Sequence, residues 1–283
     1  MIRVEDLIFQ YPKNDSPTLK GLSFEIQSGE VFGFLGPSGA GKSTAQKVLY
    51  KILTGYQGKV EIEGKDLNLW DSSFYEKIGV GFELPNHYLK LSGRENLDLF
   101  ASFYPKNSGR DVLKLFEMVG LEDDMNKPVE AYSKGMKMRL NFIRAIQHDP
   151  AILFFDEPTA GLDPVNGHKM KQHILDLKKS GKTIFITTHN MNTADELCDR
   201  VSFIVDGELK ITDTPKALKT KYGKEAVNVE LKNGESDEFS LKDLGENADF
   251  INFLKKGEIN RIHTLEASLE EVFINVTGKT LKI

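Results

Sequence analysis

The chain has 283 residues, 40% of them hydrophobic and 28% charged, and at roughly 150 residues per domain this length predicts one large domain and a smaller one. No apolar run approaches the ~18 residues needed to cross a bilayer, and the formal net charge of −5 argues against a broad basic surface for nucleic acid. The single cysteine, Cys198, excludes an internal disulfide and a cysteine-based zinc site, and the first residues lack the pattern of a signal peptide, so we expect a cytoplasmic protein.

The first part of the chain alternates apolar and polar residues with a period of two. This alternation predicts antiparallel strands at residues 2–11 and 22–26. The continuous apolar run at residues 31–35 predicts a strand that is buried on both faces. A glycine-rich loop then leads to residues 42–53, whose apolar spacing is helical, and residues 59–64 predict an edge strand or hairpin.

The middle of the chain, from about residue 90 to 147, changes to a helical spacing of apolar residues, and we interpret it as a helical insert. Three short apolar runs follow, at residues 151–155, 183–188 and 201–205, and helical patterns separate them. Strands that alternate with helices predict a mostly parallel sheet covered on both faces.

The last part of the chain becomes polar and acid-rich near residue 220. It contains a strand-like segment at 226–231, an Asn233-Gly234 turn and a helical pattern at 268–276. We therefore expect residues 1–220 to form the main domain and residues 221–283 a small α+β appendage. The predicted fold class is α/β, with an N-terminal antiparallel β subdomain, a mostly parallel sheet, the helical insert and this appendage.

A phosphate-binding loop is the clearest chemical motif. The segment GPSGAGKST satisfies the pattern GxxxxGK[ST] between a predicted strand and a predicted helix, which indicates a P-loop NTPase core rather than a simple glycine-rich turn. Backbone N–H groups and the helix N-terminus would bind phosphate oxygens, Lys42 would reach the β- and γ-phosphates, and Ser43 would ligate Mg²⁺. The residues expected to bind the nucleotide here are Gly36, Pro37, Ser38, Gly39, Ala40, Gly41, Lys42, Ser43 and Thr44.

An acidic pair, Asp156 and Glu157, follows the apolar strand at 151–155. In open α/β sheets, ligands bind beyond the carboxyl ends of the strands. We expect Asp156 to hold Mg²⁺ and Glu157 to polarise the water that attacks the γ-phosphate. Such a pair is by itself more often a solvated loop or a helix cap, but the phosphate-binding loop favours the catalytic interpretation.

Two further side chains are candidates for contacts with the nucleotide. His189 follows the strand at 183–188 on the same sheet edge, and we interpret it as a γ-phosphate contact that orients the water, although a lone histidine there is more often a capping or packing residue. Tyr11 closes the first strand and could stack on an adenine ring, while a core position suits it equally well.

With these motifs in this order, residues 1–220 resemble the ATP-binding cassette (ABC) ATPases, the nucleotide-binding subunits of ABC transporters. The family's signature segment is matched by YSKGM at 132–136, its aspartate loop by AGLD at 160–163, and its switch histidine by His189. The resemblance implies a head-to-tail pair of cassettes, in which each ATP lies between the phosphate loop of one and the signature of the other. It therefore adds Ser133, Gly135 and Asp163 to the expected nucleotide-binding residues, although Ser133 could simply cap a helix.

The sequence departs from the family pattern at three positions. Lys134 stands where the family has the middle glycine of the signature, and Met136 where it has glutamine. Glu83 stands where the family normally has a glutamine that contacts the nucleotide and Mg²⁺. A carboxylate would bring a full negative charge to this position, so metal affinity could differ.

The resemblance also implies partners. In the family, the segment corresponding to residues 83–95 and the helical insert form a groove for a cytoplasmic helix of an integral-membrane permease subunit, although burial of its apolar residues under the insert is an equally good interpretation. The ending SLEEVFINVTG at 268–278 resembles the tail of bacterial drug, lipid or polysaccharide exporters. We therefore expect an exporter subunit, peripheral on the inner face of the membrane, that forms a homodimer or a heterodimer of cassettes.

Two alternative functions are weaker. A non-transport relative acting on DNA or ribosomes is disfavoured by the acidic charge balance, by an interval of about a hundred residues between phosphate loop and signature, and by the single cassette. A small-molecule kinase would need neither the signature nor the switch histidine, although a phosphate loop alone does not fix the reaction. No nucleic-acid partner is expected.

Overall fold

The chain folds into two compact units, Met1–Asp213 and a second unit that begins at Thr214, somewhat before the boundary after residue 220 that the sequence suggested. The computed structural model describes most of both units, namely residues 1–104, 111–222, 226–265 and 267–279. Throughout these residues, no helix combines the length and the apolar composition that crossing a membrane requires.

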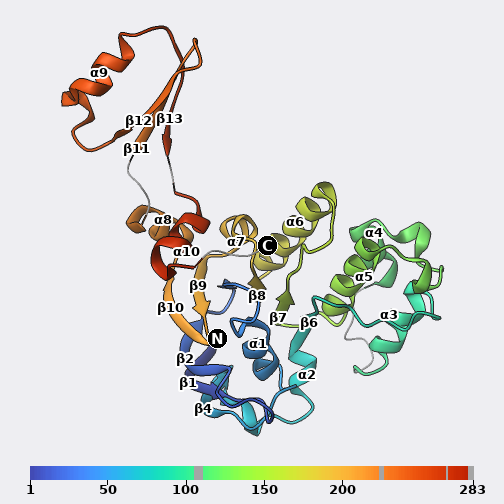
Figure 1. The fold of residues 1–283 in the computed structure, drawn as a ribbon. Coiled ribbons are helices and arrows are strands. Elements are labelled where there is room, and N and C mark those ends of the chain that lie inside the picture. Colours follow the sequence, from blue (N-terminus) through green and yellow to red (C-terminus); the bar gives the residue numbers. More distant parts are fainter. Residues whose placement is uncertain (105–110, 223–225, 266, 280–283) are drawn as a thin grey trace. The chain divides into compact units, whose positions relative to one another are not determined.

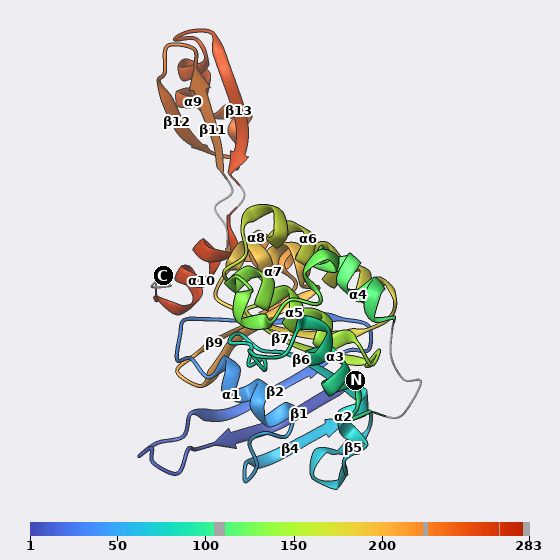
Figure 2. The same cartoon turned by 90° about the vertical axis from the view of Figure 1, so that its right-hand side faces the viewer.

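The first unit begins with an antiparallel sheet, whose strands are seen in Figure 2. Its strand order is β2-β1-β4-β5, and the alternating burial along β1 places Ile2 and Val4 in the core while the residues between them face solvent. The strands are β1 (Ile2–Phe9), β2 (Leu19–Ile26), β4 (Gln57–Ile62) and β5 (Lys65–Asp66).

The second sheet of this unit has six strands in the order β10-β9-β3-β8-β7-β6. The five strands from β9 to β6 pair in parallel, and the edge strand β10 is antiparallel, joined to β9 by a turn at Asp206-Gly207. The mostly parallel sheet is thus confirmed. Its strands are β3 (Val31–Leu35), β6 (Ile78–Gly81), β7 (Ile152–Asp156), β8 (Thr183–Thr188), β9 (Arg200–Val205) and β10 (Glu208–Asp213).

The hydrophobic core of the first unit lies where these two sheets face each other. Every residue of β3 and β8 is buried, as their uninterrupted apolar sequences predicted. Phe24 of β2 packs against Phe32, Phe34 and Phe185, with ring centroids 4.8–6.1 Å apart. This aromatic cluster therefore connects the antiparallel sheet to the parallel sheet.

Helices pack against strands of the parallel sheet, and two of them, between β7 and β8 and between β8 and β9, form crossover connections. The helix after the phosphate loop is shorter than the predicted 42–53, because Lys51 adopts a left-handed φ of 60° that a helix cannot continue. These helices are α1 (Lys42–Leu49), α2 (Phe74–Lys77), α6 (Pro164–Lys179) and α7 (Met191–Leu197).

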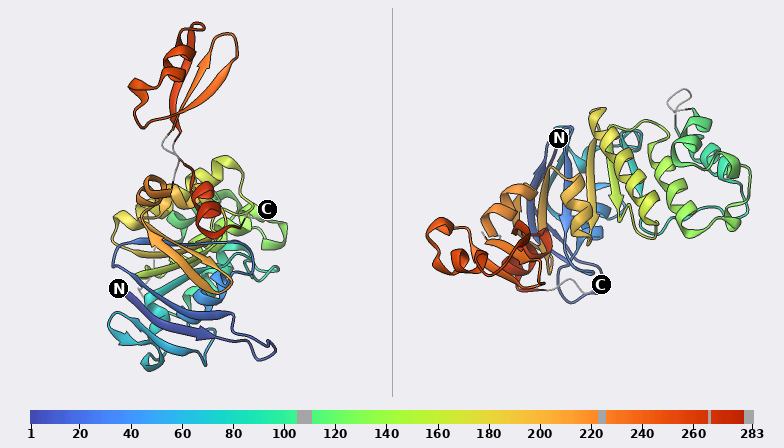
Figure 3. Two further views of the ribbon diagram at one scale, coloured as in Figure 1. Left: turned by 60° about the vertical axis from the view of Figure 1, so that its left-hand side comes forward. Right: turned by 90° about the horizontal axis from the view of Figure 1, so that it is seen from above.

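The helical insert contains α3 (Gly93–Ala101), α4 (Val112–Val119) and α5 (Lys134–Ile146). Figure 1 and the right panel of Figure 3 show these helices grouped beside β6 and β7. Ser92 begins α3 with a reciprocal capping box to Glu95, which satisfies backbone N–H groups at the helix start. The α5 helix is the element of the insert that contacts β6.

The second unit contains an antiparallel sheet of order β12-β11-β13, and α9 lies against one face of it (Figure 1). Its small core joins Val227, Val229 and Leu231 of the central strand to Phe239 and Phe253. The two remaining helices pack against each other. The elements are α8 (Pro215–Tyr222), β11 (Ala226–Leu231), β12 (Ser236–Ser240), α9 (Ala248–Leu254), β13 (Ile259–Leu265) and α10 (Leu269–Thr277).

We predict that Phe185→Ala lowers the free energy of unfolding of the first unit by about 3–5 kcal/mol, because it leaves a cavity between the two sheets. The shift of the urea unfolding midpoint measures this loss. The matched control is Phe103→Ala, since Phe103 is 69% exposed and its removal leaves the core intact. Equal midpoints for the two variants would contradict the assigned position of the core.

Candidate nucleotide-binding and catalytic site

The phosphate loop connects β3 to α1 through a backbone path that only glycine follows without strain. Gly39 and Gly41 have φ values of 81° and 105°, in the left-handed region. At Gly36 the restriction is space, because a Cβ there would lie 2.1 Å from the carbonyl oxygen of Ile204 on β9. The three glycines therefore let the loop turn tightly in front of the N-terminus of α1.

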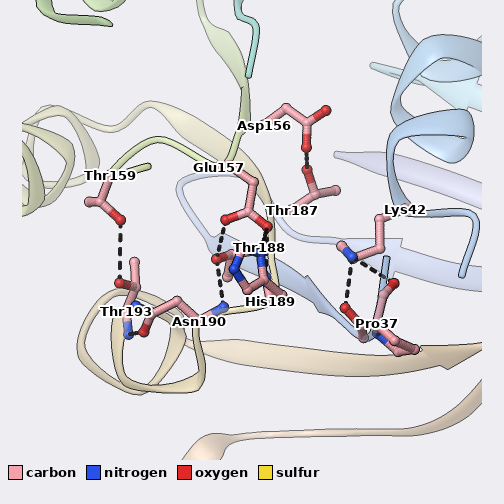
Figure 4. Close-up of polar contacts among 11 residues, drawn as sticks. Pro37, Lys42, Asp156, Glu157, Thr159, Thr187, Thr188, His189, Asn190 and Thr193 are labelled. Carbon is pink, nitrogen blue, oxygen red and sulfur yellow. Dashed lines mark hydrogen bonds and ion pairs between the residues drawn. The ribbon is translucent and has the colours of Figure 1, made fainter. Parts of the chain in front are cut away.

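Lys42, the first residue of α1, directs its ammonium group back into this loop. Its Nζ donates hydrogen bonds to the carbonyl oxygens of Gly36 at 2.7 Å and Pro37 at 3.0 Å (Figure 4). The residue is only 8% exposed, and burial lowers the pKa of Lys42, while the nearby carboxylates of Glu157, Asp156 and, less strongly, Glu83 act to raise it. A triphosphate in the loop would supply negative charge directly beside the ammonium.

Three oxygen-bearing side chains near this loop match the expected metal ligands. Asp156 ends β7 and accepts a hydrogen bond from the Thr187 hydroxyl of β8 (Figure 4). Ser43 is the second residue of α1, and Glu83 is exposed just after β6; in the described part of the chain neither side chain makes a hydrogen bond or an ion pair. Hydroxyl and carboxylate oxygens are the donors that Mg²⁺ prefers, so these residues fit the ion.

Glu157 follows Asp156 in a strained turn with a φ of 49°, an uncommon value for a residue other than glycine. Its carboxylate is buried and accepts three hydrogen bonds (Figure 4). The donors are the Thr188 hydroxyl at 2.8 Å, the His189 backbone N–H at 2.8 Å and the His189 ring Nδ1 at 2.5 Å. The turn and these donors together fix the direction of the carboxylate.

His189 is brought to Glu157, as the shared sheet edge suggested, but its ring contacts the carboxylate directly. Because a carboxylate only accepts hydrogen bonds, the contact assigns a proton to Nδ1 and leaves Nε2 for another partner. The next residue, Asn190, caps α7 by accepting from Thr193 N at 2.9 Å. The histidine therefore lies between the Glu157 carboxylate and the start of α7.

Tyr11 lies just beyond the end of β1, outside the strand that was predicted to include it. Its ring is half-buried and meets Phe9 edge-on, with centroids 5.0 Å apart. Its hydroxyl is 3.3 Å from the Thr44 hydroxyl of α1. Tyr11 thus lies beside the phosphate loop, and its stacking on adenine stays a prediction.

The signature residues form a second group at the start of α5. Ser133 caps this helix, its hydroxyl accepting a hydrogen bond from Met136 N at 3.2 Å. The Lys134 side chain lies over Gly161, since a Cβ on that glycine would come within 2.7 Å of Lys134 Cε. Gly135 faces the same loop, with the carbonyl oxygen of Gly161 3.7 Å from an added Cβ. The signature and the aspartate loop are therefore adjacent.

Asp163 closes this second group by capping α6. Its Oδ1 accepts from the backbone N–H groups of Val165 and Asn166, both at 3.0 Å, and its Oδ2 from the Asn166 amide at 2.6 Å. The hydrogen bonds from Asn166 are the main reason that the pKa of Asp163 lies below its usual value. Among the residues that the structure describes, no hydrogen bond or ion pair joins this group to residues 36–44.

Three supporting residues were not predicted from the sequence. Thr187 and Thr188 donate hydrogen bonds to the carboxylates of Asp156 and Glu157, and the threonine pair that ends the apolar run at 183–188 was the available signal. Gln46 of α1 is buried, and its Nε2 donates to the carbonyl oxygens of Phe155 at 3.1 Å and Phe185 at 3.3 Å. It thereby ties the helix after the phosphate loop to β7 and β8.

The first unit is a P-loop NTPase domain by its sheet order and by the loop at its edge, and comparison with known families agrees. The model of the ABC transporter family matches residues 19–160. A second model, the fluoroquinolone efflux ABC transporter C-terminal domain, matches residues 225–266.

Curated relatives and solved structures extend this likeness. The chain is 48% identical to the fluoroquinolones export ATP-binding protein of Mycobacterium tuberculosis, over 99% of this chain and 94% of the relative. It is 28% identical to the linearmycin resistance ATP-binding protein of Bacillus subtilis over the full length of both. A dimeric ATP-binding cassette in a post-hydrolysis state with ADP and phosphate is 27% identical, with a TM-score of 0.70 over 76% of this chain and 98% of that one.

The chain therefore belongs to the ABC transporter family, as an ATP-binding and ATP-hydrolysing subunit. This confirms the family, the α/β fold class, and ATP as the nucleotide that the sequence predicted.

We predict that Lys42→Ala weakens ATP binding by roughly 10–150-fold, the equivalent of the 1.5–3 kcal/mol of a charge-assisted hydrogen bond. Titration of the purified protein with a fluorescent ATP analogue measures the change in Kd. Lys47→Ala, in the last turn of the same helix, is the matched control and should retain parental affinity. Parental affinity in Lys42→Ala would remove this residue from the site.

Proposed function

We propose that this ABC ATPase works as a Mg²⁺-dependent, head-to-tail dimer on the inner face of the cell membrane, where it powers export of fluoroquinolone-like aromatic compounds through integral-membrane permease subunits. The observation that carries the catalytic part is the buried Glu157 carboxylate, aimed by three hydrogen bonds beside the loop that holds Lys42. The observation that carries the export part is 48% identity to a fluoroquinolones export protein across almost the whole chain.

Positioning and charge neutralisation account for the chemistry. The loop N–H groups and Lys42 hold the triphosphate, while Glu157 orients the attacking water and receives its proton. Bound Mg²⁺ supplies charge neutralisation of the phosphate oxygens, and Ser43, Asp156 and Glu83 are the side chains that would hold it. His189 aligns Glu157 and, with its other ring nitrogen, reaches toward the γ-phosphate.

The second group of residues supports the dimer. Ser133, Gly135 and Asp163 lie together at the starts of α5 and α6, where helix N-termini favour an anion. Their role is to contact the ATP held by the phosphate loop of the opposite cassette. The exposed Lys134 at the first position of α5 adds a positive charge to that surface. The partner cassette is a second copy of this chain or a related one.

A groove in the first unit supports the permease partner. A cavity of about 480 Å³ lies between the segment that follows β6 and the helical insert, and its lining is mainly apolar. Leu84 at its rim is 72% exposed, and Tyr88 and Leu89 nearby are also exposed. Exposed apolar groups around a concave surface suit a protein partner. The groove is where a cytoplasmic helix of the membrane subunit would bind.

We predict that Glu157→Gln lowers ATP turnover by ~10²–10⁴ while ATP still binds, as expected for loss of a general base. Phosphate release by the purified protein measures turnover, and nucleotide titration measures binding. Glu208→Gln is the matched control, because Glu208 is an exposed residue paired only with Lys210 on the surface of β10. Near-parental turnover in Glu157→Gln would exclude Glu157 as the catalytic carboxylate.

We also predict that cells producing this chain with its permease accumulate less norfloxacin than cells producing the permease with the Glu157→Gln variant. Intracellular drug fluorescence measures accumulation directly, and dissipation of the proton gradient in both strains excludes secondary transporters as its cause. Equal accumulation in the two strains would reject fluoroquinolones as cargo and leave the ATPase assignment intact.

A further inference from the structure

Arg144 on α5 is a charged group buried in the wall of the groove described above. It is 7% exposed and lines the cavity together with Phe82, Phe100, Gln147 and His148. Burying a charge is costly unless an opposite charge or a full set of hydrogen bonds compensates it. The surroundings of this guanidinium therefore indicate what the groove is built to receive.

The contacts of Arg144 are all with neutral groups. Its Nη1 donates to the carbonyl oxygen of Asn86 at 2.8 Å and its Nη2 to Oδ1 of Asn141 at 2.8 Å. The guanidinium carbon lies 4.6 Å from the ring centroid of Phe100 and 5.9 Å from that of Phe82. These contacts use two of the five N–H donors of a guanidinium. Within the described residues, no carboxylate forms an ion pair with it.

The positive charge of Arg144 also affects the pKa of a neighbouring histidine. His87, in the segment after β6, has its pKa lowered to about 4, first by burial and then by the charge of Arg144. Burial is likewise the main cause that lowers the pKa of Arg144 to about 10. The shifts thus reflect the burial of both groups and, for His87, the nearby charge of Arg144 as the second cause.

A second, independent feature of the groove wall is its unsatisfied polar atoms. Gln147 is 4% exposed, and neither its Oε1 nor its Nε2 has a hydrogen-bond partner in the described structure. His148 uses Nε2, 2.8 Å from the carbonyl oxygen of Ile78, but within the same described residues its buried Nδ1 is unpaired. Buried polar groups without partners are rare in native proteins and often mark a place where a ligand or partner group completes the set.

The rest of the lining limits the kind of occupant. Apolar and aromatic side chains, among them Ile78, Val80, Leu84 and Tyr104, make up most of the wall. A cavity of about 480 Å³ has room for a few side chains of one helix rather than for a whole domain. Charge complementarity to a buried guanidinium requires a carboxylate among those side chains, since a bidentate arginine–carboxylate pair satisfies both charges.

We propose that the groove receives an amphipathic cytoplasmic helix of the permease that inserts an aspartate or glutamate carboxylate onto Arg144. This inference rests on the proposed function, because it specifies the chemistry of the permease segment. The apolar side chains of that helix fill the aromatic wall, and its polar groups complete the hydrogen bonding of Gln147. The carboxylate accepts from the guanidinium N–H groups that Asn86 and Asn141 leave free.

The test is recovery of the detergent-solubilised transporter after co-expression of the full chain with its permease. Arg144→Gln removes the charge and keeps amide donors, so we expect recovered permease to fall roughly 30-fold or more, as for loss of one partner of a buried charge pair. Basal ATPase activity and the Kd for ATP of the purified chain should stay within about twofold, since in the described structure Arg144 has no hydrogen bond or ion pair with residues 36–44, Asp156 or Glu157. Arg94→Gln is the matched control, because Arg94 is an exposed residue of α3 paired with Asp98.

Substitutions in the permease identify the carboxylate. Because they leave this chain unchanged, they cannot affect its folding. Each aspartate and glutamate in the cytoplasmic segments of the permease is changed to its amide, and one such change should reproduce the loss seen with Arg144→Gln. Arg144→Glu combined with arginine at that permease position should restore recovery. Undiminished recovery with Arg144→Gln and with every amide variant would overturn the inference while the proposed function stands. If the parental chain recovers no permease, the proposed function fails and the inference fails with it.

Discussion

The parallel pairing of β3, β8 and β7 is the constraint on which the nucleotide site depends, because it brings three loops to one edge of the sheet. β3 pairs with β8 along its whole length, and the register of β7 on β8 sets Asp156 beside Thr187. The buried ammonium of Lys42 and the carboxylates of Asp156 and Glu157 are thereby gathered in a region where solvent screens charges weakly. Neither sign of charge would be stable there alone, so the ammonium and the carboxylates stabilise one another at this edge.

The hydrogen bond between Glu157 and His189 links two of the residues at this edge of the sheet. The histidine ring holds the carboxylate through Nδ1, and the Thr188 hydroxyl holds it from the other side. The sequence assigned the two residues separate tasks, one on water and the other on the γ-phosphate. An imidazole has two ring nitrogens, so Nδ1 can stay on Glu157 while Nε2 is left for a second partner. The geometry therefore joins Glu157 and His189 into one hydrogen-bonded pair at the edge of the sheet.

Much of this site could be predicted from the sequence because its motifs are local. The phosphate loop, the acidic pair after β7 and the Ser133 cap each occupy a few consecutive residues with a fixed relation to one strand or helix. What could not be predicted depends on side chains that meet across the fold. In the sequence, Gln46 is an ordinary helix residue. In the structure, its side-chain amide donates hydrogen bonds to backbone carbonyl oxygens of two strands. The early end of α1 likewise depends on the left-handed turn at Lys51, which no residue preference signalled.

The α5 helix connects the signature to the groove within one rigid element. Ser133 caps its first turn, whereas Asn141 and Arg144 near its other end hold the carbonyl oxygens of Phe82 and Asn86 in the segment that contains Glu83. Thirteen residues at 1.5 Å each make the helix roughly 20 Å long. The wall of the groove and the Ser133 cap are therefore parts of one helix, and Asn141 ties that helix to the segment carrying Glu83.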